Sequence, residues 1–135
     1  MGQRFLIDTN ILIYYFNNSI PSGTIAEVDK VFRSSFNISV ISKIEFLGWR
    51  GYNEAQFALA EKILHQATLY QITDEIINES IQLKRQKKIK TPDAVIAATC
   101  LVNDSTLVTR NISDFAKIDG LRIYNPFAPE QKYKE

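Results

Sequence analysis

The sequence contains few of the features that define several classes of protein. Its 135 residues include one cysteine, Cys100, so no disulfide can form within the chain, and a single histidine, so a cluster of His and Cys metal ligands is excluded. The formal net charge is only +1, which predicts no strong attraction of the whole molecule for nucleic acid. Any such attraction must therefore come from a local basic patch.

Long apolar runs are also missing. None approaches the roughly 18 residues needed to span a bilayer, so we expect no membrane partner. The N-terminus reaches Asp8 before the apolar core of a signal peptide is complete, and the lone cysteine fits a reducing cytoplasm. The length is typical of one domain. We expect that domain to span residues 1–126 and the charged residues 127–135 to form a loose tail.

Short apolar runs and helical spacings alternate along the chain. The runs predict strands at residues 5–7, 37–41, 69–72, 106–109 and 121–124. Apolar spacing and capping residues predict helices from Asp8 or Asn10 to Phe16, around 25–32, from Ser42, over 53–67, after Thr73 and from Thr91 to about 102. Strands separated by helices imply parallel strands with right-handed crossovers. The predicted fold is therefore α/β, a three-layer α/β/α sandwich with a central parallel sheet.

Acidic and amide side chains follow the strands where each strand stops or the next helix starts. They are Asp8, Glu45, Asp93, Asn111 and Asp114. Because the carboxyl ends of parallel strands face a common crevice, we expect these groups to converge.

Each acid also has a purely structural explanation. Asp8 would cap a helix, Glu45 would complete a Ser42-x-x-Glu45 capping box, and Asp93 would complement a helix dipole. The conjunction favours a site, because all the acids fall at one edge of the predicted sheet, whereas surface caps would be scattered over both ends.

Carboxylates that meet closely need a counter-charge. Two of them about 4 Å apart repel by about 4 kcal/mol at an effective dielectric constant of about 20, against a total stability of about 5 to 15 kcal/mol for a domain. Helix N-termini favour the anionic form, so a divalent cation is a better remedy than protonation. An all-oxygen ligand set indicates Mg²⁺ or Mn²⁺ rather than zinc.

A run of basic residues precedes Asp93. It comprises Lys84, Arg85, Lys87, Lys88 and Lys90. One explanation is that cations in a last helical turn complement the helix dipole and face water. The other is that the patch guides a phosphate backbone toward the acids. Arg110, beside Asn111, is a further candidate for contact with phosphate.

An aromatic group follows Glu45. Trp49, Arg50 and Tyr52 could stack on an unpaired base. Packing or a dimer surface is the more common use of such residues, and the sequence alone leaves both explanations open.

Four motifs, in this order, resemble the PIN domain family, in particular the VapC-type toxins of bacterial toxin–antitoxin pairs. They are FLIDTN from Phe5, ISVISKIEFLG around Glu45, TPDAVIAATC around Asp93, and LVTRNISDF around Asn111 and Asp114. The resemblance covers about residues 4–126. Its specificity lies in the combination, since Asp-Thr-Asn alone is a weak signal.

The resemblance implies a Mg²⁺- or Mn²⁺-dependent endoribonuclease with a parallel-sheet α/β/α fold, which dimerises and is inhibited by a cognate antitoxin protein. By position, Asp8, Glu45 and Asp93 match the acidic core, with Asp8 and Asp93 as the main metal ligands and Glu45 orienting or deprotonating the attacking water. The matching supporting residues are Thr9 and Asn10 in the first loop and Thr109 beside the site.

The sequence departs from this family at the fourth acid. Many relatives carry an acid two residues after the Thr that corresponds to Thr109, whereas this chain has Asn111 there. Either Asp114 contributes from one turn further on, or the site uses three carboxylates.

Two other classes of function stay open. The first is a PIN-like fold that lost catalysis with its fourth acid and only binds RNA or protein. The second is phosphoryl transfer through Asp8 as a phospho-acceptor at a strand end. Asn10 disfavours the second, because a dehalogenase-like motif places another Asp at that position.

Overall fold

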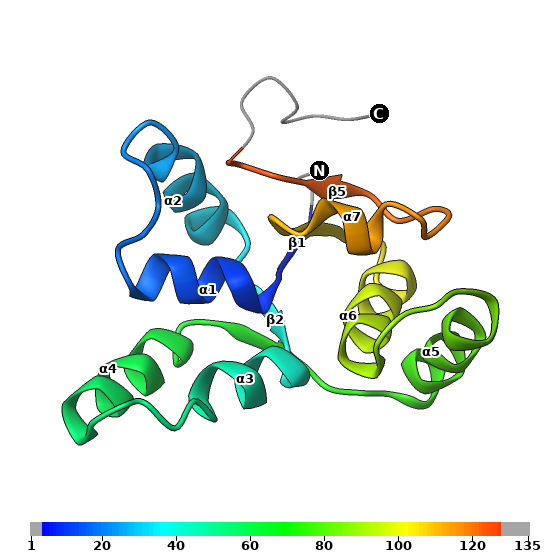
Figure 1. Ribbon diagram of the computed structural model, residues 1–135, viewed down its shortest axis with the longest axis horizontal. Coiled ribbons are helices and arrows are strands. Elements are labelled where there is room, and N and C mark those ends of the chain that lie inside the picture. The colour runs from blue at the N-terminus through cyan, green and yellow to red at the C-terminus, as the bar shows by residue number, and fades with distance from the viewer. Residues whose placement is uncertain (1–3, 128–135) are drawn as a thin grey trace.

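The computed structural model describes residues 4–127, in which short strands alternate with helices (Figure 1). The strands are β1 (Phe5–Ile7), β2 (Asn37–Ser39), β3 (Thr68–Tyr70), β4 (Thr106–Val108) and β5 (Ile123–Tyr124). The helices are α1 (Thr9–Phe16), α2 (Ile25–Ser34), α3 (Val40–Leu47), α4 (Glu54–Leu64), α5 (Asp74–Gln86), α6 (Thr91–Val102) and α7 (Ile112–Phe115). None of the described helices is long and apolar enough to cross a membrane.

Every strand pairing is parallel. β4 lies between β1 and β5 in one sheet, and β2 pairs with β3 in a second. β1 and β2 also lie next to each other, which gives the overall strand order β3-β2-β1-β4-β5. The α/β class predicted from the sequence is therefore confirmed.

Polar side chains join the two sheets between β1 and β2. The Asn37 amide donates hydrogen bonds to the Phe5 carbonyl, at 2.9 Å, and to Ser35 Oγ, at 2.8 Å. Ser35 Oγ in turn accepts from the Phe5 backbone N–H at 3.0 Å. These side chains satisfy backbone groups of β1 that a neighbouring strand would otherwise satisfy.

Two apolar cores lie on opposite faces of the strands. Phe5, Ile7 and Val108 pack on one face against α1, α2 and α4. Leu6 and Leu107, which alternate with them, pack on the other face against α5 and α6. The helices therefore form two outer layers around the strands, as Figure 1 shows.

Helix α3 begins earlier than predicted. Ser39 ends β2 and caps the helix, its Oγ accepting from the Ile41 N–H at 3.0 Å. The predicted strand through Ile41 and the Ser42-x-x-Glu45 capping box are therefore wrong. The apolar pair Val40-Ile41 is compatible with either a strand or a helix, and this ambiguity caused the error. Glu45 consequently lies in the second turn of α3.

Other differences are small. Lys90, not Thr91, is the N-cap of α6, so the predicted Thr91 cap is wrong by one residue, and Asp93 stays in the first turn. The short helix α7 was not predicted, because one turn shows no periodicity. Phe127, placed by the sequence at the start of the tail, packs with its ring centroid 5.3 Å from that of Tyr14. Residues 128–135 of the predicted tail lie outside the described residues.

Asn37→Ala should lower the free energy of unfolding by about 1 to 3 kcal/mol, because it leaves the half-buried Phe5 carbonyl without its amide donor. Urea denaturation would measure the change. Asn78→Ala, at an exposed position on α5, is the matched control and should change stability by less than about 0.5 kcal/mol. Equal effects of the two substitutions would contradict the bridging role of Asn37.

Candidate active site

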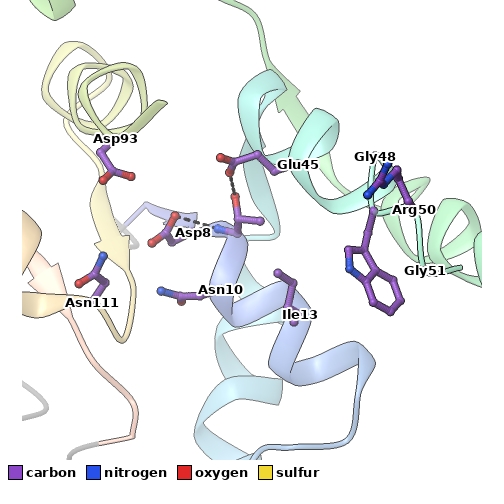
Figure 2. Close-up of a pocket in the computed structure, with 11 residues that line it drawn as sticks. Asp8, Asn10, Ile13, Glu45, Gly48, Arg50, Gly51, Asp93 and Asn111 are labelled. Carbon is purple, nitrogen blue, oxygen red and sulfur yellow. Dashed lines mark hydrogen bonds between the residues drawn. The ribbon is translucent and has the colours of Figure 1, made fainter. Parts of the chain in front are cut away.

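A cleft of about 930 Å³ opens where β1 and β4 end. Asp8, Glu45 and Asp93 line it, together with Asn10 and Asn111. Figure 2 shows these five side chains directed toward a common space, from four separate segments of the chain. The structure thus brings the three acids of the predicted core around one cavity.

Asp8 is the most buried of these acids, with 6% of its surface exposed. One carboxylate oxygen accepts from the Thr9 N–H at 2.8 Å, and the other accepts from Thr109 Oγ1 at 2.7 Å. Burial is the largest influence and raises the pKa of Asp8 from 3.8 to about 6, although the two hydrogen bonds oppose it. The negative charges of Asp93 and Glu45 raise this pKa further.

Asp93 is held in the first turn of α6 and is half-buried. Burial raises the pKa of Asp93, and the charges of Asp114 and Glu45 raise it further, whereas Lys90 and Lys117 lower it. Asp8 and Asp93 therefore each become harder to ionise through burial and through neighbouring acids. Carboxylates in a cleft whose pKa values are raised by burial and by neighbouring acids are candidates for a functional site.

Glu45 is exposed and is oriented by α1. Thr9 Oγ1 donates to Glu45 Oε1 at 2.6 Å. Ser42 Oγ lies 3.0 Å from the same hydroxyl. Because the single Thr9 hydroxyl proton points to Glu45, the fully buried Ser42 must be the donor in the second bond. Ser42 and Thr9 thus form a chain that fixes one oxygen of Glu45.

Thr109 connects the far side of the cleft. Besides donating to Asp8, its hydroxyl accepts from the Asn111 N–H at 2.9 Å, and the Asn10 amide lies at 3.4 Å. The Arg110 N–H approaches Asn10 Oδ1 at 3.5 Å. Thr9, Asn10 and Thr109, which the resemblance assigned as supporting residues, therefore all contact the acids or each other.

Asp114 lies outside the main cleft. Its carboxylate accepts from the Asn111 amide at 2.7 Å. It lines an adjoining groove of about 300 Å³, whose wall also includes Lys88, Lys90 and Lys117. Asp93 lines both cavities, so the charge of Asp114 reaches the cleft through Asp93.

The donor set suits a hard cation bound partly through water. Among residues 4–127, no three Asp, Glu, His or Cys side chains lie close enough together to hold a metal ion directly. Mg²⁺ commonly binds through one or two carboxylates and keeps several waters, so a hydrated ion would not need three carboxylates in direct contact. Asp8 and Asp93 both line the cleft and are the carboxylates best placed to hold it, and a bound cation would favour their ionised forms.

The predicted basic residues have different environments. Lys88 and Lys90 border the groove beside Asp93. Lys84 Nζ donates to the Ile89 carbonyl at 3.0 Å and so braces the turn before α6. Arg85 is exposed and Lys87, the C-cap of α5, is half-buried, and neither lines the cleft or the groove.

Arg110 directly precedes Asn111, which lines the cleft. Its guanidinium carbon is 5.1 Å from the ring centroid of Tyr14 and 4.8 Å from that of Phe127. This cation–π contact fixes the side chain at an exposed position.

The sequence did not reveal two residues of the site. Lys117 lowers the pKa of Asp93 and donates a hydrogen bond to the Lys88 carbonyl. Its position three residues after Asp114 was the only available signal. Ser42 was interpreted as a cap, and its bond with Thr9 depends on α1 packing against α3.

Comparison with known proteins places this geometry in a family context. The family model described as PIN domain matches residues 5–121. A chain of a toxin–antitoxin complex from Klebsiella pneumoniae is 30% identical with a TM-score of 0.71, and the match covers 90% of this chain and 96% of that one. No curated protein sequence gives a significant match.

Another solved structure is similar in fold at lower identity. A chain of DNA-bound VapBC from Salmonella typhimurium is 22% identical with a TM-score of 0.81, and the match covers 93% of this chain and 99% of that one. The arrangement of helices and parallel strands is therefore shared along almost the whole length.

Asp8→Asn should stabilise the fold at neutral pH in the presence of a chelator. The folded state holds the Asp8 proton up to about pH 6, whereas the ordinary value is 3.8, so stability falls as the pH rises through this window. The loss is roughly 3 kcal/mol, from about 1.4 kcal/mol per pKa unit, and the Asn variant should escape most of it.

Urea denaturation at pH 4 and pH 7.5 would test this. The variant should gain stability over the wild type at pH 7.5 and little at pH 4. Asp119→Asn, at an exposed position, should follow the wild type at both values. An Asp8→Asn protein whose stability changes with pH as the wild type does would refute the burial argument.

Proposed function

Because the chain belongs to the PIN domain family, whose VapC members are nucleases, we propose that it is a divalent-metal-dependent endoribonuclease and the toxin of a toxin–antitoxin pair. The observation that carries this proposal is the cleft shared by Asp8, Glu45 and Asp93, two of which have raised pKa values. Burial and neighbouring acids disfavour the ionised forms of Asp8 and Asp93, and a bound divalent cation would offset that cost.

The residues have distinct tasks in the proposed reaction. Asp8 and Asp93 would hold Mg²⁺ or Mn²⁺, partly through water. The bound ion supplies hydroxide near neutral pH and neutralises charge on the phosphate. Glu45, with one oxygen fixed by Thr9, would use the other to orient and deprotonate the attacking water.

Attack by the water oxygen forms a new bond to phosphorus and breaks the bond to the 3′ oxygen. Glu45 takes the water proton, and the departing 3′ oxygen takes a proton from solvent. The products are a 5′-phosphate and a 3′-hydroxyl. Lys88, Lys90 and Arg110, which flank the acids, are the best-placed contacts for the RNA backbone.

Asp114 would act indirectly in this scheme. Because the Asn111 amide occupies one of its oxygens and it lies in the adjoining groove, it tunes Asp93 rather than binding the ion. The core would therefore comprise three carboxylates.

Cleavage of labelled RNA tests the assignment. Wild-type protein should cut in Mg²⁺ or Mn²⁺ and stop in EDTA. Asp8→Asn and Asp93→Asn should each reduce the rate at least about 100-fold, because each removes a proposed metal ligand. Asp114→Asn should cost far less than either of these substitutions, because it leaves both proposed ligands in place and only lowers the pKa of Asp93. Glu61→Gln, on the exposed face of α4, is the control.

Stabilisation by Mg²⁺ without cleavage of any RNA would replace the nuclease with a binding module. Full activity in Asp8→Asn protein would remove the acids from the mechanism. Ligation of a 3′ adaptor to the 5′ fragment, which requires a free 3′-hydroxyl, checks the stated products.

Two protein partners belong to the proposal. The likeness to a chain of a toxin–antitoxin complex supports a cognate antitoxin as the first partner. We expect the pair to act in the cytoplasm, without a membrane partner.

The second partner is another copy of the chain. Helix α5 has an exposed face that carries four residues along its length. Asp74 lies three residues before Ile77, and Lys84 lies three residues after Ile81. Ile77 and Ile81 are 43% and 49% exposed.

This face is self-complementary in an antiparallel arrangement. If two α5 helices pack around a twofold axis near residue 79, Ile77 of one copy meets Ile81 of the other, and Asp74 meets Lys84. Charges of opposite sign then flank the apolar centre on both sides.

Charge reversal tests this dimer. Lys84→Asp or Asp74→Lys alone should shift the protein toward monomer in analytical ultracentrifugation, because each places like charges opposite one another. The double variant Asp74→Lys/Lys84→Asp should restore the dimer. A wild-type monomer, or single variants that dimerise normally, would show that α5 is not the interface.

A further inference from the structure

A small apolar pocket opens beside the acidic cleft. Its volume is about 240 Å³. Its four aromatic residues are Phe16, Phe46, Trp49 and Tyr52. Ile13 is aliphatic, and Asn17 and Glu45 supply polar groups. We call this cavity the side pocket.

Three residues of the side pocket also line the cleft. Glu45 and Trp49 line both cavities, as does Ile13. A group bound in the side pocket therefore lies directly beside the carboxylate that would activate water.

Trp49 is a fixed but exposed aromatic surface. It is 63% exposed, which is unusual for the largest apolar side chain. Its ring stands nearly perpendicular to that of Tyr52, at 86° and with 5.2 Å between centroids. The Tyr52 hydroxyl is itself anchored to the Phe46 carbonyl at 2.8 Å.

Gly51 allows this position of the indole. A Cβ atom at residue 51 would lie 2.2 Å from the Trp49 Cη2 atom, so any larger residue must displace the ring. The ring is the far end of a side chain, so it can move without disrupting the backbone. The glycine therefore leaves space that the indole fills.

We propose that the side pocket binds one unpaired nucleobase of the RNA, stacked on Trp49, while the adjoining phosphate lies in the acidic cleft. This inference rests on the proposed function. The pocket is smaller than the roughly 300–1,000 Å³ typical of drug-sized ligands, which suits a single ring system. Aromatic walls bind the faces of a base, and Asn17 supplies a polar side chain in the same lining for its edge.

Charge in the cleft supports a base as the occupant. Three acids repel a phosphate, so the RNA needs contacts that do not depend on its charge. Stacking on an aromatic ring provides such contacts for any base. The exposed Arg50, in the same cleft wall as Trp49, offers a cation to the backbone that leads to the pocket.

The intrinsic fluorescence of the protein gives a direct readout, because Trp49 is the only tryptophan. Asp8→Asn protein would be titrated with short single-stranded RNA, so that no cleavage interferes. Its fluorescence should be quenched saturably. An oligonucleotide with the same phosphates but abasic positions should bind at least about fivefold more weakly and quench little, since stacking of one base is worth about 1 to 3 kcal/mol.

Substitutions in the Asp8→Asn background test the position of the ring. Trp49→Ala, followed by fluorescence anisotropy of labelled RNA, should weaken binding about fivefold or more, and Trp49→Phe should recover part of the loss. Gly51→Ala, which keeps the indole but moves it, should also weaken binding. Leu59→Ala, an equally exposed apolar residue of α4 outside the side pocket, should bind as its parent does.

The outcomes separate this inference from the proposed function. Normal cleavage by wild-type protein, with equal binding of base-containing and abasic strands, would overturn the base pocket and leave the nuclease intact. Base-dependent quenching of the Asp8→Asn protein, together with no cleavage by the wild-type protein, would support the pocket and reject the nuclease. Quenching by a polypeptide partner but by no RNA would overturn the pocket in favour of a protein-docking site.

Discussion

The candidate site depends on one buried carboxylate. Asp8 ends β1, caps α1 and accepts from Thr109 at the end of β4, so residues 101 positions apart meet at this group. Its burial costs stability when it is ionised, as the pKa of about 6 shows. A fold retains such a cost where a charge is useful, and functional sites are where strongly perturbed carboxylates gather.

The second half of the site is held by hydroxyl groups. Thr9 follows Asp8 directly and donates to Glu45, so α1 and α3 are aligned by a bond between residues 36 positions apart. This alignment requires β1 and β2 to lie side by side. Ser35 and Asn37 join these strands through side chains, because the strands belong to separate sheets. The geometry of Glu45 thus depends on polar contacts at the other end of the same strands.

The sequence predicted the layers and the edge of the sheet on which the acids lie, because both follow from periodicity and strand polarity. It could not predict contacts that depend on how helices pack. Ser42 looked like a cap and is instead a buried donor, while Val40-Ile41 looked like strand and is helix. The role of Asp114 stayed open in the sequence, since its bond to Asn111 and its separate groove are tertiary features. Trp49 stayed ambiguous because its exposure and its close approach to Gly51 are tertiary features.

The arrangement of charge has a consequence for the order of binding. Asp8, Glu45 and Asp93 repel one another and would repel a phosphate, whereas a cation among them removes both penalties. By linkage, any factor by which the cation strengthens RNA binding is also the factor by which RNA strengthens cation binding. A base in the side pocket would add affinity for RNA that does not depend on this coupling with the cation, since stacking involves no net charge. The cleft would then hold the RNA phosphate weakly until the cation is bound. The aromatic wall would align the strand before that step.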